Sequence, residues 1–321
     1  MLFAEAKMDL RKIYRVIAMA VGSGIVLLFV HYADTFFVFT DVAKPGKSVT
    51  SSNVYYKKEA TRTGPRRADN GNHISAYTQQ LLKQIRSYVT PPSRTLPRWL
   101  ARRRSGHASQ AGQSQFVDKL LSRRRNGFFI ECGAANGVSL SNTLFFELER
   151  NWTGLLIDAN PLFQRSLLKI HRRAYVLPAC LSTERRPTTV RFRLASVLSG
   201  IADTKHQSRT YFMNNLTITT IGVKCFPLNA VLEAINVSHV DFFSLDVEGP
   251  ELEILQTIDW NYLRIDVISV EYRINTEEWT LRKLEALRRF FRDTGLYREV
   301  GLLPNVTDEV LGLDVIFQRL T

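Results

Sequence analysis

Ten residues, Phe128 to Gly137, constrain the fold more than any other part of the chain. Apolar residues that favour strands are followed by Glu131 and by two glycines, Gly133 and Gly137. This order predicts a buried strand that ends in a tight turn, where the backbone can approach a ligand closely. Residues 139–150 then read as a helix, whose N-terminus would direct free N–H groups toward that turn.

A second predicted strand, residues 154–157, ends at Asp158. An acid at this distance after a glycine turn commonly accepts hydrogen bonds from ribose hydroxyls, so the two features together predict a nucleoside site. The alternative is an ordinary strand-turn-helix unit that binds no ligand. The dinucleotide fingerprint G-x-G-x-x-G is incomplete here, which disfavours a nicotinamide or flavin cofactor.

Strands and helices alternate through the rest of the C-terminal half. This alternation predicts an α/β fold with a doubly wound, mostly parallel sheet and an antiparallel edge. Ligands of such sheets bind at the carboxyl ends of the strands, so Glu131, Asp158, Asp246 and Glu271 should share one rim. Further strands are expected at residues 175–180, 188–194 paired with 216–223, 240–245, 265–270 and 313–317, and helices at residues 115–122, 161–171, 227–235, after Pro250 and at 278–294.

The net charge of +13 is concentrated in one segment. Residues 41–126 hold 18 basic and 4 acidic side chains, whereas residues 127–321 hold 21 and 23. The basic segment is rich in proline and arginine and cannot build a core, so residues 36–112 are predicted to be a low-order stem with a short helix at 77–89, and the folded domain is predicted at 113–321. Its basic clusters fit a solvated spacer, a surface for acidic glycans or lipid headgroups, or dibasic processing sites.

Residues 16–33 form an apolar run interrupted only by His31, and four basic residues precede it. This pattern predicts a single transmembrane signal anchor at 16–35, with residues 1–15 in the cytosol and the domain in the lumen or outside the cell, as in a type II membrane protein. A cleaved signal peptide is the main alternative. A luminal domain would have no nucleic-acid partner.

Glycosylation acceptors support that topology. Asn215, Asn236 and Asn305 each begin an N-x-[ST] triplet beyond the predicted anchor, and we expect them to carry glycans. Asn151 begins another triplet but directly precedes the second strand, where a glycan is harder to accommodate.

Three pieces of the domain resemble the FkbM-type methyltransferase family: residues 131–137 (ECGAANG), 156–161 (LIDANP) and 241–252 (DFFSLDVEGPEL), the last with the pattern D-x-E-G-x-E. The resemblance covers about residues 113–319. It implies a Rossmann-like methyltransferase fold and S-adenosylmethionine as cofactor, bound by Glu131, Gly133, Ala134, Gly137 and Asp158. The family usually places Asn directly after the G-A pair, whereas Ala135 intervenes here.

A closer resemblance, to the membrane-anchored branch that contains the insect protein Star, is carried by residues 179–182, 198–201 and 225–228. It implies a glycoprotein of the endoplasmic reticulum, Golgi, endosome or plasma membrane that escorts membrane-bound client proteins, without necessary methyl transfer.

Two functions therefore remain open. The first is O-methyl transfer to a hydroxyl, for example of a glycan. Because the rim pieces contain no histidine, the base would be Asp246, Glu248 or Glu271. The alternative role for Asp246 and Glu248 is to cap the helix that Pro250 begins. The second function is a transport adaptor that retains the fold. The predicted topology, the anchor and the closer resemblance favour the adaptor, whereas the intact glycine turn and Asp158 favour the enzyme. No metal site is predicted.

The three cysteines lack the C-x-x-C spacing of zinc or redox sites. In the predicted fold, Cys180 and Cys225 should lie near the same rim, where an oxidising lumen would let them form a disulfide. Cys132, inside the glycine turn, should stay free. Two buried, unpaired thiols at 180 and 225 are the alternative.

Overall fold

The computed structural model describes residues 76–102, 106–194, 199–202, 219–273, 276–303 and 313–320, all within the unit His73–Thr321. The predicted cytosolic tail and anchor lie outside these residues, as do Asn215 and Asn305. Among the helices in the described ranges, none combines the length and the hydrophobicity needed to cross a bilayer.

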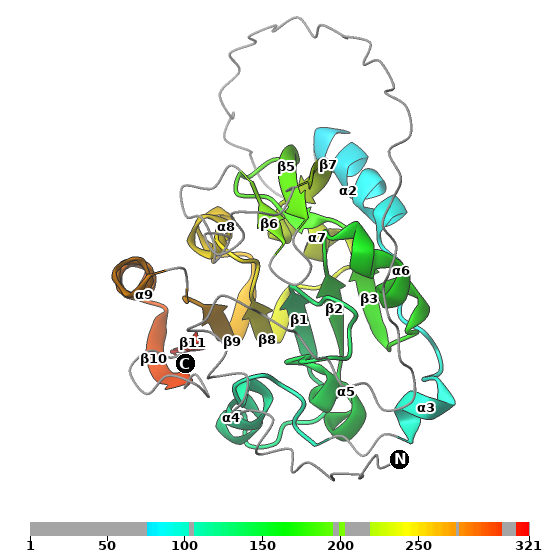
Figure 1. The fold of residues 1–321 in the computed structure, drawn as a ribbon, viewed down its shortest axis with the longest axis horizontal. Helices are drawn as coiled ribbons and strands as arrows, with labels where there is room; N and C mark the ends of the chain where they lie inside the picture. Colours follow the sequence, from blue (N-terminus) through cyan, green and yellow to red (C-terminus); the bar gives the residue numbers. More distant parts are fainter. Residues whose placement is uncertain are drawn as a thin grey trace, which may run out of the picture. The chain divides into compact units, whose positions relative to one another are not determined.

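A seven-stranded mixed sheet forms the centre of the described part of the chain (Figure 1). Neighbours in the run β9-β8-β1-β2-β3 are parallel, and β11 and β10 continue the sheet antiparallel beyond β9. This confirms the predicted α/β class with a mostly parallel, Rossmann-like sheet and an antiparallel edge. Across the sheet the strands are β10 (Tyr297–Leu303), β11 (Asp314–Arg319), β9 (Arg264–Glu271), β8 (His239–Leu245), β1 (Phe128–Cys132), β2 (Thr153–Ile157) and β3 (Ala174–Leu177).

Helices cover both faces of this sheet, because its strands are apolar on both sides. On one face Ile130 and Phe243 pack with α2 (Ala76–Tyr88), α7 (Leu228–Ala234), α8 (Glu251–Thr257) and α9 (Glu277–Thr294). On the other face Phe129 and Phe242 pack with α4 (Gln113–Leu120), α5 (Leu144–Arg150) and α6 (Pro161–Lys169). A short helix, α3 (Arg98–Ala101), buries Leu100.

Part of the predicted stem belongs to the folded unit. The short helix expected at 77–89 is α2, and its Leu82 and Ile85 are buried in the core. The Arg86 side chain donates a hydrogen bond to the Ala234 carbonyl at the end of α7, 2.9 Å away. The domain therefore begins before residue 113, because an amphipathic helix buries its apolar face wherever the sheet offers one.

A second, four-stranded sheet lies beside the carboxyl ends of the main strands, in the order β4 (Cys180–Leu181), β7 (Thr219–Phe226), β5 (Thr188–Leu194) and β6 (Gly200–Ile201). The strand expected at 175–180 is divided between the two sheets, because Pro178 has no N–H to continue the ladder. The predicted antiparallel pairing of 188–194 with the following segment is present as β5 with β7. A disulfide joins Cys180 to Cys225, and Cys132 is buried and free.

Two further differences from the sequence-based expectation concern the start of α5 and the edge of the main sheet. The helix expected to begin at residue 139 begins at Leu144. The strand expected at 313–317 is β11, but β10 lies outside it and forms the edge. β10 was not predicted, because its sequence, YREVGLL, has the mixed polarity of an exposed edge strand rather than a buried run.

Candidate functional site

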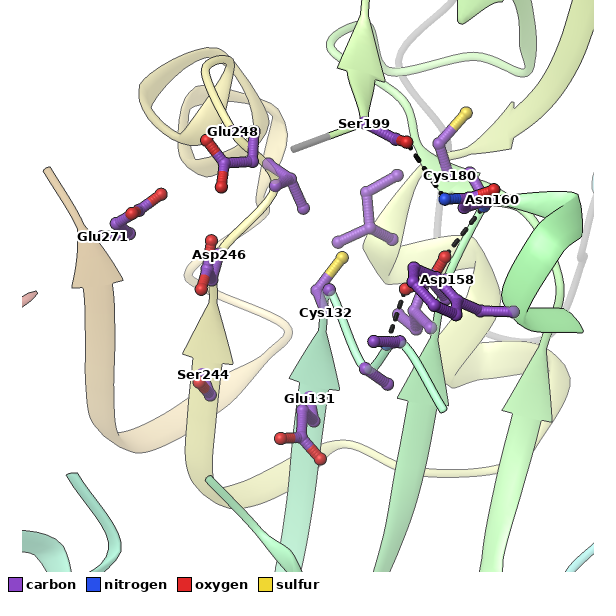
Figure 2. Close-up of a pocket in the computed structure, with 18 of the residues that line it drawn as sticks. Glu131, Cys132, Asp158, Asn160, Cys180, Ser199, Ser244, Asp246, Glu248 and Glu271 are labelled. Atoms are coloured by element: carbon purple, nitrogen blue, oxygen red, sulfur yellow. Dashed lines mark hydrogen bonds between the residues drawn. The ribbon is translucent and has the colours of Figure 1, made fainter. Parts of the chain in front are cut away.

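A cavity of about 270 Å³ opens at the carboxyl ends of β1, β2, β8 and β9, where the sheet topology places ligand sites. Figure 2 shows Asp158 and Asn160 on one side of the end of β1, and Asp246, Glu248 and Glu271 on the other. The second sheet contributes Cys180, Phe192 and Ile201 to the walls. Of the predicted cofactor-binding residues, Glu131, Gly133, Ala134 and Asp158 line the cavity, and Gly137 is not among the described lining residues.

The two glycines of the turn are required by the protein's own backbone. Gly133 has φ +90°, and a Cβ there would lie 1.8 Å from the Asp246 carbonyl oxygen. Gly137 has φ +76°, and a Cβ there would lie 2.9 Å from Leu167 Cδ1. From the sequence, these glycines were expected to let a ligand approach the backbone closely. In the structure they are required because both have a left-handed backbone conformation and because a Cβ would collide with the residue after β8 or with α6.

Glu131 holds the segment that follows the turn. It is 4% exposed, and its carboxylate accepts hydrogen bonds from Asn142 N (2.6 Å), Ser141 Oγ (2.8 Å) and Thr143 Oγ1 (2.6 Å). These bonds fix residues 141–143 in a non-helical conformation, which is why α5 begins only at Leu144. Glu131 lies in the cavity floor, but much of its acceptor capacity is used by this segment.

Arg172 also contacts residues of this segment. No sequence pattern predicts this role, because Arg172 lies in a basic triplet, residues 171–173, that is typical of a surface. Its side chain is fully buried, with Nε 2.7 Å from Glu147 Oε2 and Nη1 3.6 Å from Glu131 Oε2. The guanidinium also donates to the Gly137 carbonyl and to Thr143 Oγ1. The glycine turn is therefore built over a buried ionic network.

Asp158 links the end of β2 to the turn. Its Oδ2 accepts a hydrogen bond from Ala135 N at 2.7 Å and its Oδ1 from Asn160 N at 2.8 Å. Burial raises the pKa of Asp158 to about 6, although these two hydrogen bonds oppose the shift. Each oxygen retains a lone pair, so Asp158 can still accept from a ligand hydroxyl in the cavity.

The three predicted catalytic carboxyls come together, and we call Asp246, Glu248 and Glu271 the acidic trio. Their carboxylate oxygens lie within 4.8 Å of one another. Burial, reinforced by the nearby Glu248 carboxylate, raises the pKa of Asp246 to about 8, and a hydrogen bond with Glu271 opposes this. Near neutral pH the group therefore holds a proton that it can exchange.

Helix α8 has no side-chain cap at its N-terminus, and two amides of the preceding turn are bonded by Glu251 rather than by Asp246 or Glu248. Glu251 Oε1 accepts hydrogen bonds from Val247 N and Gly249 N, each at 3.1 Å. The turn between them holds Glu248 at φ +61°. Glu251 is the last acid of the D-x-E-G-x-E pattern, and the sequence alone does not predict this structural role for it.

Carboxylates as close as those of the acidic trio are typical ligands of a divalent cation. The sequence predicts no metal site here. The buried ammonium of Lys283 supplies positive charge next to Asp246 and Glu271, and its Nζ lies 2.6 Å from Glu251 Oε2.

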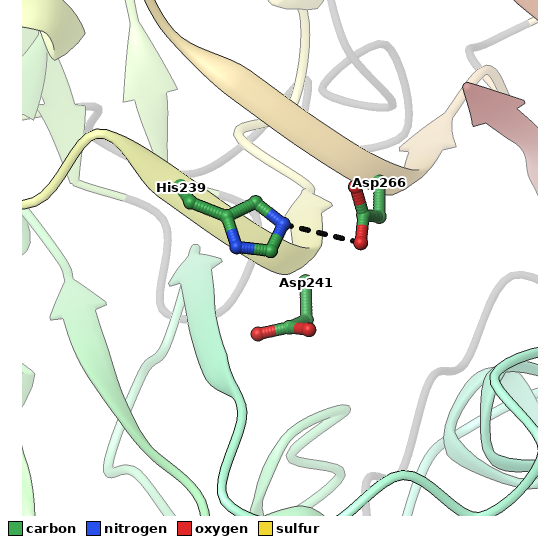
Figure 3. A group of neighbouring side chains, drawn as sticks. All are labelled: His239, Asp241 and Asp266. Carbon is green, nitrogen blue, oxygen red and sulfur yellow. Dashed lines mark ion pairs between the residues drawn. The ribbon is translucent and has the colours of Figure 1, made fainter. Parts of the chain in front are cut away.

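A second cluster, His239, Asp241 and Asp266, lies on β8 and β9 toward their amino ends (Figure 3). Arg124 pairs with both Asp241 and Asp266, and Asp241 also accepts from Phe128 N. These acids therefore anchor strand ends rather than form an open site.

The charge of the cavity limits its ligand. Five acids line it, Glu131, Asp158, Asp246, Glu248 and Glu271, and no lysine, arginine or histidine is among the described lining residues. The turn offers no phosphate cradle of free amides either. Val138 N and Ser139 N donate to Asn136 Oδ1, and Ala135 N donates to Asp158. A cavity of this kind disfavours phosphorylated nucleotides and favours a nucleoside that carries positive charge.

Comparison with solved structures found methyltransferases of low sequence identity. The FkbM methyltransferase of Methylobacillus flagellatus has a TM-score of 0.38 and 14% identity, covering 60% of this chain and 43% of that one, so the chain spans less than half of its length. Fibrillarin of Aeropyrum pernix, solved with natively bound S-adenosylmethionine, has a TM-score of 0.35 and 13% identity, covering 69% of this chain and 76% of that one. Comparison with curated proteins gave no match.

The Methyltransferase FkbM domain matches residues 131–297, which include the glycine turn, Asp158 and the acidic trio. The match confirms the family resemblance drawn from the three sequence pieces. Because the matched stretch is more than half of the 321 residues, the chain belongs to the Methyltransferase FkbM domain family.

Proposed function

We propose that the domain binds S-adenosylmethionine in the acidic cavity and transfers its methyl group to a hydroxyl. The observation that carries the proposal is the lining of five acids without a basic residue among the described ones, which suits a positively charged nucleoside. Asp158 would accept from the ribose hydroxyls, and Glu131, Gly133 and Ala134 line the same cavity. Gly137 contributes indirectly, by shaping the turn.

Bound there, S-adenosylmethionine would supply an electrophilic methyl group on a sulfonium. The chain's own part is to orient the acceptor and remove its proton. Asp246 would do this in its ionised form: its pKa of about 8 makes that carboxylate a stronger base than an ordinary one, and a fraction of it is ionised near neutral pH. The acceptor hydroxyl would donate its hydrogen bond to an oxygen of the trio. Glycans, which present many hydroxyls, are a suitable acceptor class.

Replacing Asp158 by alanine should weaken binding of S-adenosylmethionine and of S-adenosylhomocysteine alike, because both present the same ribose. We expect a loss of about 1–3 kcal/mol, roughly 5- to 150-fold in affinity, measured by calorimetry. The control is Asp259→Ala, since Asp259 also accepts from a backbone amide, Asn261 N at 3.1 Å, but is exposed on the surface. If both variants bound these ligands with the wild-type affinity, Asp158 would not be a ligand-binding residue.

The pH dependence of wild-type binding gives a second readout of Asp158. The ribose hydroxyls need the ionised carboxylate as acceptor, and the pKa of Asp158 is raised to about 6. Affinity for both ligands should therefore fall as pH decreases through about 6, approaching tenfold per pH unit below it. A flat profile between pH 5 and 7 would contradict this role.

We also propose that this domain acts in the secretory pathway, as the resemblance to the branch containing Star implies. The apolar run at 16–33 with its basic flank supports a single-pass, type II protein of the endoplasmic reticulum, Golgi, endosome or plasma membrane. Its partners there would be membrane-bound client proteins or acidic glycans. The disulfide between Cys180 and Cys225 fits an oxidising lumen. Cofactor binding is compatible with this role whether or not turnover occurs.

In this topology the chain made in animal cells should stay in the membrane after carbonate washing. Glycosidase treatment should also lower its mass, because Asn236 is exposed and Asn215 and Asn305 are further acceptors. Asn→Gln substitution at all three positions is the control and should remove the mass change. A chain released by carbonate without any glycosidase-sensitive mass would contradict a luminal, anchored domain.

A further inference from the structure

Lys283 is a buried charge that the proposed chemistry does not use. It lies on α9, whose neighbouring core residues are apolar, and its side chain is 4% exposed. Its Nζ is 2.6 Å from Glu251 Oε2, and the Glu251 side chain is completely buried. Burial alone would lower the pKa of Lys283, but the carboxylates of Glu251, Glu271 and Asp246 outweigh it and raise that pKa above its ordinary value. The ammonium therefore stays charged inside the protein.

Glu251 connects this charge to the turn that presents Glu248. While Oε2 pairs with Lys283, Oε1 accepts from Val247 N and Gly249 N, the amides on either side of Glu248. Glu248 has φ +61°, a conformation that costs a non-glycine residue free energy and persists only where its surroundings impose it. The Glu251 carboxylate, held from behind by Lys283, supplies that constraint.

Lys283 also faces the acidic trio itself. Among the described residues, the charged groups around the trio come from four elements: Arg193 of β5 faces Glu248, Glu251 lies on α8, Lys283 on α9 and Asp314 on β11. Together with the trio they gather five acids, Asp246, Glu248, Glu271, Glu251 and Asp314, against the cations Arg193 and Lys283. Lys283 is the buried cation whose charge acts on Asp246, Glu271 and Glu251, whereas Arg193 faces Glu248, so Lys283 offsets part of the mutual repulsion of the carboxyls gathered at one end of the cavity.

We propose that Lys283 is a positioning residue for the site: through Glu251 it holds the turn that presents Glu248, and its ammonium balances the charge of the acidic trio. The inference rests on the proposed binding of S-adenosylmethionine. An ion pair that merely tied α9 to α8 would stabilise the fold but would leave the charge facing the ligand unchanged.

The test compares ligands that differ in charge. S-adenosylmethionine carries a positive sulfonium that S-adenosylhomocysteine lacks, so the ratio of the two affinities reports the negative charge of the trio. Contributions common to both ligands, including those of Asp158, cancel in the ratio. We expect the preference for S-adenosylmethionine to rise with pH as Asp246 ionises, with a midpoint near the pKa of Asp246, about 8.

Three variants of the full chain carry predictions of different sign, each measured by calorimetry across pH. Lys283→Met should move the midpoint of the ligand preference to higher pH by about one unit or more. The reason is that the loss of a nearby positive charge raises the pKa of Asp246 further. Glu251→Gln should move it to lower pH, since a negative charge is lost while its amide oxygen can still accept from the turn. The double variant keeps the net charge, so its midpoint should return close to that of the wild type.

Midpoints that stay unchanged in both single variants would overturn the inference and leave a purely structural ion pair. If Lys283→Met fails to fold, two results still test the inference. The midpoint should shift to lower pH in Glu251→Gln, and it should return to the wild-type value in the double variant. Failure of the proposed function has a different signature: the wild type would bind neither ligand at any pH, and the inference would fall with it.

Discussion

Gly133→Ala should prevent the domain from folding stably, which is the largest effect of any single methyl group that we expect in this chain. The added Cβ would lie 1.8 Å from the Asp246 carbonyl oxygen, and the residue has φ +90°. The carbonyl cannot retreat easily, because Asp246 N donates to the Cys132 carbonyl at 3.0 Å and holds the end of β8 against β1. We expect a loss of at least about 4–5 kcal/mol, measured by urea or thermal unfolding of the full chain.

The matched control is Gly222→Ala. Gly222 lies in β7, is exposed, and a Cβ there would meet only Thr189 Cγ2 at 3.8 Å. This variant should unfold within about 0.5 kcal/mol of the wild type. A Gly133→Ala protein that unfolds like Gly222→Ala would show that the end of β8 adjusts freely. The glycine would then be explained by the ligand, as the sequence alone suggested.

Arg172→Met should destabilise the domain by about 3–5 kcal/mol, because it leaves buried carboxylates without their positive partner. Glu147 is completely buried and would lose a pairing at 2.7 Å, and Glu131 would lose one at 3.6 Å. The Gly137 carbonyl would also lose its donor. Thermal unfolding followed by circular dichroism gives the change.

Arg282→Met serves as the control, because Arg282 pairs with Glu278 on the exposed surface of α9 and its removal should cost no more than about 0.5 kcal/mol. Adding Glu147→Gln to Arg172→Met should recover part of the loss, since the uncompensated charge disappears. A single Arg172→Met variant as stable as Arg282→Met would mean that these carboxyls take up protons at little cost.

The parts of the site that can be predicted from the sequence are those whose positions follow from a local sequence pattern. A strand that ends in a glycine turn placed Gly133 and Ala134 at the cavity, and the acid after the next strand placed Asp158 there. The rule that the carboxyl ends of parallel strands share one rim predicts that Asp246 and Glu271 lie close together, as they do. The same rule placed Cys180 near Cys225.

The parts that were missed depend on contacts between distant segments. Arg172 looks like a surface residue until Glu131 and Glu147 surround it. The start of α5 is decided by a carboxylate ten or more residues earlier, because Glu131 takes the amide and hydroxyls that would begin the helix. Lys283 occupies a position of α9 that the helical periodicity assigns to the core. No sequence pattern predicts that the buried carboxylate of Glu251 lies next to it.

The measurement that tests the central claim most directly is calorimetry of the wild-type chain at pH 7.5 with S-adenosylmethionine and, separately, with ADP. The two ligands share the adenosine group but differ in charge, and five acids line the cavity without a basic side chain among the described lining residues. We predict that S-adenosylmethionine binds at least about tenfold more tightly, a difference of about 1.4 kcal/mol. Equal or tighter binding of ADP, or no binding of S-adenosylmethionine at millimolar concentration, would contradict the account.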